Sequence, residues 1–182
     1  MRWEQLFTDL EGQLEAEQRA VVDGDVADLV RAERARLTLP DRLRAHVGEQ
    51  LTWSMGAGET SVTGELLDVG VDWVLLRARR GEMLIPLAAV HYVTGLSRAA
   101  TPSTGEVARR LGLTVLLRGL SRDRAAVRVR LRSGEEMTGT IDRVGADHLD
   151  LAVHAADLPR RSEAVREVRC LLLPVITGVT VG

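Results

Sequence analysis

Two stretches of the chain show the same alternation of apolar and polar positions. The first covers residues 63–76 (TGELLDVGVDWVLL) and the second covers residues 138–151 (TGTIDRVGADHLDL), and they align without a gap. The alternation has a period of two on both sides of a Val-Gly-x-Asp turn, which predicts a strand, a tight turn and a second strand. The chain is therefore built on one unit that it uses twice.

Each copy lies within a longer repeated segment. Residues 51–55 and 127–131 precede the copies as further alternating strands that enter Gly-containing hairpin turns, and the apolar segments 83–93 and 170–179 follow them. Each unit thus has about five short strands, and a unit of this kind removes its exposed edges by closing into a small barrel.

The repeated residues resemble the Sm-like (Lsm) family. The resemblance rests on the pattern Gly-x-apolar-x-x-Val followed by Leu, at residues 64–76 and 139–151, and it covers about residues 49–94 and 126–180. It is closest to small bacterial Sm-like proteins that carry Val-Gly-x-Asp in this turn. The resemblance implies a bent five-stranded barrel, often assembled into rings and often bound to RNA. Other SH3-like small barrels are the alternative.

The repeat departs from that family at particular positions. Gly70 and Gly145 stand where the family has the Asp of its first motif, and Val74 and Leu149 stand where it has an RNA-contacting Asn. Apolar side chains cannot hydrogen-bond a base edge. We therefore expect no ring that holds uridine-rich RNA in its pore.

Residues that recur in the turns and bends of both copies predict a structural role. Gly on the strongly bent second strand leaves no side chain to crowd the backbone, and the Asp of each turn stabilises it. The residues that we interpret as structural are Gly64, Gly70, Asp72, Gly139, Gly145 and Asp147.

The first 36 residues repeat their apolar positions at helical intervals, which predicts an amphipathic helix. Gly24 between two Asp indicates a kink or a break, so the segment is one long kinked helix or a helical hairpin. Its first 33 residues carry nine acidic side chains against three Arg. The apolar face packs on its own domain or on a partner protein. The candidate interaction residues are Trp3, Leu6, Phe7, Leu10 and Leu14.

The predicted fold class is mainly β with helices (α+β), with an N-terminal helical segment followed by two tandem Sm-like five-stranded barrels. The predicted parts are 1–36 for the acidic helical segment, 37–97 for the first barrel with its entry helix, 98–126 for a linker and helix, and 127–182 for the second barrel. Ser103 and Glu106 form a capping-box pattern within the linker, and a further helix is expected across residues 116–122.

Composition indicates an ordinary globular protein. Hydrophobic residues make up 45% of the chain, the net charge is −2, and all 24 basic residues are Arg. The single Cys170 cannot form an internal disulfide, and we expect it to be reduced and buried in an apolar strand. No stretch resembles a signal peptide or a membrane span. We expect a soluble, cytoplasmic protein that does not enter a membrane.

The sequence has few patterns that indicate catalysis. The four His show no metal-ligand spacing, there is no Cys pair, and no Gly-rich loop or partnered nucleophile is recognisable. His148 and His154 lie near several Asp that can ligate a cation, but a solvent-exposed turn is the simpler interpretation. We therefore predict that the protein is not an enzyme and has no catalytic residues, metal site, cofactor or small-molecule substrate.

Positive charge collects in residues 109–132, which carry eight Arg against one Asp. Strand alternation predicts that Arg128, Arg130 and Arg132 point outward, and outward Arg side chains can bind phosphates bidentately. Alternatively, the acidic N-terminal segment or another subunit neutralises these charges. We call the following residues the Arg face: Arg118, Arg122, Arg124, Arg128, Arg130 and Arg132.

The leading functional hypothesis is a non-catalytic interaction or assembly module. It would act through barrel edges and the acidic helix, with a protein partner or with further copies of itself. The alternative is a protein that binds RNA or another nucleic acid through the Arg face.

Overall fold

The computed structural model describes residues 31–32, 34–55, 61–102, 111–154 and 167–181. Two compact units divide the chain, Met1–Thr38 and Leu39–Gly182. In the first unit, residues 31, 32 and 34–36 are helical. The candidate interaction residues Trp3, Leu6, Phe7, Leu10 and Leu14 lie outside the described residues, as does the Ser103–Glu106 capping box.

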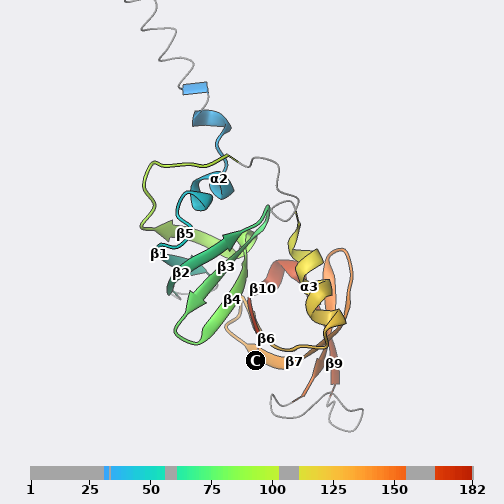
Figure 1. Cartoon of the computed structure of the whole chain (residues 1–182). Helices are drawn as coiled ribbons and strands as arrows, with labels where there is room; N and C mark the ends of the chain where they lie inside the picture. The colour runs from blue at the N-terminus through green and yellow to red at the C-terminus, as the bar shows by residue number, and fades with distance from the viewer. Residues whose placement is uncertain (1–30, 33, 56–60, 103–110, 155–166, 182) are drawn as a thin grey trace, which may run out of the picture. The chain divides into compact units, whose positions relative to one another are not determined.

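Ten antiparallel strands of the second unit form one sheet, in the order β5-β1-β2-β3-β4-β10-β6-β7-β8-β9 (Figure 1). The strands of the first half are β1 (Gln50–Met55), β2 (Ser61–Val69), β3 (Trp73–Ala78), β4 (Gly81–Pro86) and β5 (Val90–Thr94). Those of the second half are β6 (Ala126–Leu131), β7 (Glu136–Val144), β8 (His148–Val153), β9 (Glu167–Leu172) and β10 (Ile176–Val181). The prediction of a mainly β fold with a few helices is confirmed.

The two halves have matching strand arrangements. In each half the fifth strand pairs with the first, so β5 lies beside β1 and β10 lies beside β6. Gly64 pairs with Leu51 as Gly139 pairs with Val127. The second strand of each half also has an irregularity at the same place, after Leu66 and after Ile141. A β-bulge of this kind bends the strand and increases its twist.

The halves meet where β4 pairs with β10, and Leu84 lies opposite Val179. Each half has its own cluster of buried apolar side chains, with Trp53 in the first and Ile141 in the second. Trp73 and Leu84 belong to the first half but pack in the second cluster. The second core is therefore shared between the halves.

Among the described residues of the second unit, the helices are α2 (Leu39–Arg44), α3 (Leu113–Arg122) and two short 3-10 helices, η1 (Leu87–Ala89) and η3 (Leu173–Val175). Helix α3 covers the segment predicted as residues 116–122 and begins three residues earlier. It places Leu117, fully buried, in the shared core.

The structure gives Asp72 a specific role at the start of α3. Its Oδ1 accepts a hydrogen bond of 2.8 Å from the backbone N–H of Leu113, the first residue of the helix. The first N–H groups of a helix have no partner within the helix, so a carboxylate there stabilises it. Nearby, Trp73 Nε1 donates to the carbonyl of Leu111 at 2.8 Å. A turn of the first half thus holds a helix of the second.

Candidate functional site

The two outermost strands, β5 and β9, are each paired on one side within the described sheet. Both present large apolar side chains to solvent. Tyr92 on β5 is 60% exposed, and Val168 and Leu172 on β9 are 56% and 54% exposed. An edge strand also offers unpaired backbone N–H and C=O groups, so it is a template for a further strand. The described sheet therefore ends in two candidate interaction edges.

Inside the chain, the fourth strand of one half already pairs with the fifth strand of the other. The internal junction joins β4, the fourth strand of the first half, to β10, the fifth strand of the second. The outer edges are the remaining fourth and fifth strands, β9 and β5. At the junction Leu84 is 7% exposed and Val179 is 2% exposed. The chain therefore contains one buried example of the contact that its outer strands would make.

Charge on β9 is largely neutralised within the chain. Arg169 is bound to Glu135 at 2.9 Å and to Glu167 at 2.6 Å. The hydrogen bond to Glu135, followed by that to Glu167, raises the pKa of Arg169 above its ordinary value. A charge that is already paired opposes the approach of another strand less than a free one does.

The residues of the Arg face lie on different elements of the structure. Arg118 and Arg122 lie on α3, Arg128 and Arg130 lie on β6, and Arg124 and Arg132 lie just beyond these elements. Arg128 and Arg132 are exposed as predicted, whereas Arg130 is half-buried. The six residues therefore come from two elements, α3 and β6, and from the segments that follow them.

Acidic side chains of the second half neutralise part of this face. Arg130 Nε donates to Glu136 at 2.9 Å, and this hydrogen bond lowers the pKa of Glu136. Arg124 binds Asp142 at 2.9 Å. Among the described residues, no carboxylate forms an ion pair with Arg122 or Arg128.

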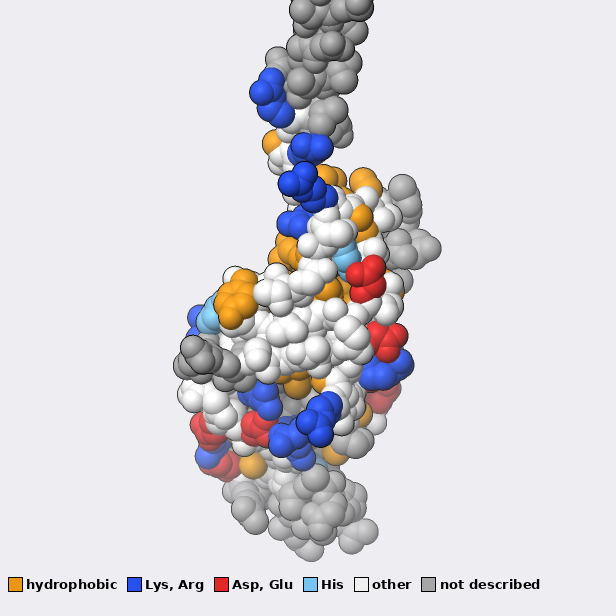
Figure 2. Space-filling view, turned by 90° about the vertical axis from the view of Figure 1, so that its left-hand side faces the viewer, with side chains coloured by type: hydrophobic (Ala, Val, Ile, Leu, Met, Phe, Trp, Pro, Cys, Tyr) orange, Lys and Arg blue, Asp and Glu red, His pale blue; other side chains and the backbone are white. Residues whose placement is uncertain are grey.

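Arg80 joins the Arg face across the junction, which sequence reasoning missed. It lies in the turn between β3 and β4, and with Arg128 it lines a cavity of about 110 Å³. The residues Arg79 and Arg80 are visible in the sequence, but only the pairing of β4 with β10 brings Arg80 to the second half. In the view of Figure 2, basic and acidic side chains lie close together around a hollow.

A wide groove of about 650 Å³ lies between α3 and the first half. Its apolar lining includes Trp73, Leu84 and Leu120, and its acidic lining includes Asp68 and Asp123. The groove exists because α3 packs on the junction, so no local sequence pattern indicates it.

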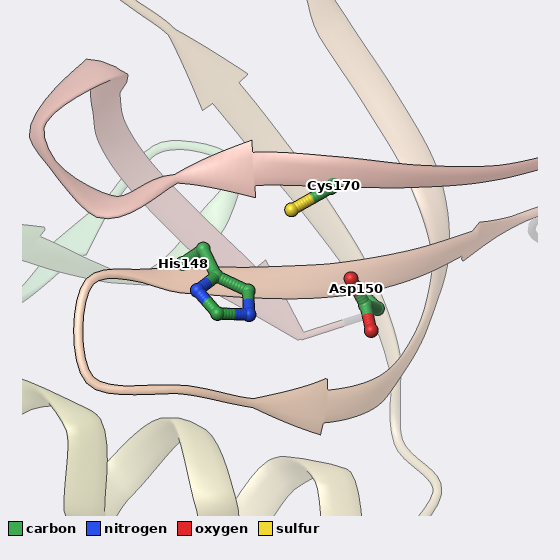
Figure 3. A group of neighbouring side chains, drawn as sticks. All are labelled: His148, Asp150 and Cys170. Carbon is green, nitrogen blue, oxygen red and sulfur yellow. The ribbon is translucent and has the colours of Figure 1, made fainter.

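A cluster of polar side chains lies on the second half, where β8 pairs with β9. His148, Asp150 and Cys170 each offer a ligand atom, and these atoms lie within 4.8 Å of one another (Figure 3). Asp150 and Cys170 are directly opposite each other in the register of the two strands. The expectation that Cys170 would be buried is wrong, because β9 is an edge strand and the thiol is exposed.

Neighbouring groups fix the members of this cluster. Asp147 Oδ1 is bound to His148 Nδ1 at 2.7 Å, and this hydrogen bond lowers the pKa of Asp147. Arg143 Nε donates to Asp150 Oδ2 at 3.0 Å. Partial desolvation, with the charge of Asp150 as the second cause, raises the pKa of the Cys170 thiol. Asp147 thus stabilises a side chain in its turn, whereas its equivalent Asp72 holds a helix.

The chain matches no protein-family model, and no curated protein is significantly similar to it. Within the part of the chain that the structure describes, none of the helices has the length and apolar character needed to cross a membrane.

Proposed function

We propose that the protein is a non-catalytic assembly module, built from two tandem Sm-like barrels, that joins to further copies of itself through β5 and β9. One observation carries the proposal. The pairing of β4 with β10 is an internal example of a contact between a fourth and a fifth strand, and the outer edges of the sheet are the complementary pair.

The register of the internal junction supplies a register for the contact between copies. Val93 pairs with Trp53 in the first half as Val179 pairs with Val129 in the second. Likewise, Cys170 takes the place on β9 that Leu84 has on β4. Val93 of one copy would therefore lie opposite Cys170 of the next. Such a contact is head-to-tail, so it closes into a ring or continues as a filament.

The mass of the protein in solution tests this proposal. Light scattering after size-exclusion chromatography should give a multiple of the 19.9 kDa chain mass. The double variant Val168→Lys, Leu172→Lys should shift the protein to the mass of one chain, because Lys on an edge strand opposes pairing with another strand. Both side chains are more than half exposed, so the fold should tolerate the change.

Val115→Lys is the matched control, because Val115 is an exposed apolar residue on α3 rather than on an edge strand. It should leave the mass of the assembly unchanged. The proposal fails if the unchanged protein has the mass of one chain at every concentration, or if the double variant assembles as well as the unchanged protein does.

Binding of nucleic acid is a second candidate function, because Arg80 and Arg128 lie together across the junction. Fluorescence anisotropy with labelled single-stranded RNA at several salt concentrations tests it. If both side chains contact phosphates, Arg80→Ala and Arg128→Ala should each weaken binding and reduce the salt slope by about 1. Arg77→Ala is the control, since Arg77 is bound to Glu65 and Glu82. The site would be excluded if Arg80→Ala and Arg128→Ala bound RNA as tightly as Arg77→Ala and the unchanged protein do.

A further inference from the structure

We propose that His148, Asp150 and Cys170 form a three-ligand binding site for Zn²⁺ on strands β8 and β9. The inference does not rest on the proposed assembly: it concerns the single chain, and a contact that places Val93 of another copy opposite Cys170 would cover the site. The three ligand atoms lie within 4.8 Å of one another. Zn²⁺ binds N, O and S ligands at about 2.0–2.3 Å, so one ion between them needs only a small approach of the ligands. The Cys170 side chain is exposed, and Asp150 is its neighbour across the two strands.

The strand register places these ligands on one face. His148 and Asp150 are two residues apart on β8, so their side chains point to the same side of the sheet. Cys170 reaches that side from β9, opposite Asp150. Figure 3 shows the three side chains gathered over the two strands. The pairing of β8 with β9 thus brings Cys170 beside residues that precede it by 20 and 22 positions in the chain.

The fold does not require polar side chains at these places. The equivalent positions of the first half are Trp73, Leu75 and Leu84, which pack in the shared core or against it. The second half has a nitrogen, an oxygen and a sulfur ligand instead. This difference between two otherwise matching halves is the main reason to assign a metal-binding role to the cluster.

Two of the ligands, His148 and Asp150, form hydrogen bonds with side chains that are not themselves ligands. Asp147 binds His148 Nδ1, which leaves Nε2 as the nitrogen available to a metal. Gly145 provides space for the imidazole, because a Cβ atom there would lie 2.5 Å from its Cε1. Arg143 holds Oδ2 of Asp150 and leaves Oδ1 available. A carboxylate behind a ligating imidazole is the usual outer arrangement of a metal site, because it fixes the orientation of the ring.

The ligand set selects the class of metal. A thiolate with an imidazole favours a borderline ion such as Zn²⁺, whereas Mg²⁺ and Ca²⁺ prefer oxygen ligands alone. Three protein ligands leave the fourth position of a tetrahedral ion for water or an external ligand. The exposure of Cys170 keeps that position accessible from solvent.

Titration of the full chain with Co²⁺ under reducing conditions tests the proposal directly. Co²⁺ replaces Zn²⁺ in such sites and gives a thiolate-to-metal charge-transfer absorption. Cys170 is the only Cys of the chain, so this absorption reports on one side chain. We expect one Co²⁺ bound per chain, complete displacement by an equivalent of Zn²⁺, and no displacement by excess Mg²⁺ or Ca²⁺.

Variants assign the ligands. Cys170→Ser should abolish the charge-transfer band, and His148→Ala should weaken Zn²⁺ binding measured by calorimetry. Asp147→Asn should reduce the affinity about 10- to 100-fold, as changes of outer partners generally do. His91→Ala is the matched control, because this His is exposed on β5 and outside the cluster, and it should bind Zn²⁺ as the unchanged protein does.

Three results would overturn the site. The first is the absence of a charge-transfer band in the folded, reduced protein. The second is unchanged Zn²⁺ affinity in Cys170→Ser, because a site that uses this thiol must bind the ion more weakly without it. The third is a stoichiometry of one ion per two chains, which would mean that the metal bridges two Cys170 side chains instead of binding within one chain.

Discussion

Gly139→Val is expected to lower the free energy of unfolding by about 3 kcal/mol, and Gly64→Val by about 1–3 kcal/mol, the range for residues at special backbone positions. A Cβ atom at Gly139 would lie 2.1 Å from the carbonyl oxygen of Ala152, and one at Gly64 would lie 2.8 Å from that of Arg77. Both oxygens belong to backbone of the neighbouring strand, so neither can move without disturbing the sheet. Denaturation by urea, followed by circular dichroism, measures the loss.

Gly119→Ala is the control for these substitutions. No atom lies within 4 Å of a Cβ atom at this position in α3, and Ala is more stable than Gly within a helix by about 0.5–1 kcal/mol. This variant should therefore unfold at a slightly higher urea concentration than the unchanged protein. If Gly139→Val unfolds at the same urea concentration as the unchanged protein, the close approach of β7 to β8 is incorrect.

The strands were the most predictable part of the fold, because alternation with a period of two is a local signal and the chain gives it twice. Gly64 and Gly139 also indicated where the second strands bend, since their surroundings exclude a side chain. A helix was predicted across residues 116–122, but the first turn of α3 was not. Its start depends on Asp72, a residue of the other half, which no local pattern connects with Leu113.

The candidate sites were less predictable because they depend on contacts between distant segments. The sequence drew attention to His148 and to nearby Asp residues, but it gave no reason to add Cys170. That association requires the register of β9 against β8. The apolar neighbours of Cys170 suggested burial, since the sequence does not show that its strand lies at an edge. Arg80 was missed for a related reason, because it reaches the Arg face only through the internal junction.

The shared core has a consequence for the stability of both halves. Leu117→Ala should lower the free energy of unfolding by about 2–5 kcal/mol, because Leu117 is fully buried and the change leaves a cavity. The same cluster contains Trp73 and Leu84 from the first half. We therefore expect the unit Leu39–Gly182 to unfold in one cooperative transition, although its sequence is a repeat.

Hydrogen exchange read strand by strand measures how far the effect of Leu117→Ala extends. The side chains of β1 and β2 contribute to the first cluster. The backbone amides of these two strands should exchange faster in the variant, together with those of β6 to β8. Val115→Ala, an exposed change in the same helix, should alter stability by less than about 0.5 kcal/mol. Faster exchange confined to the second half would show that the halves unfold separately. The β4–β10 contact would then be a docked interface rather than part of one core, and the contact proposed between copies would be correspondingly weaker.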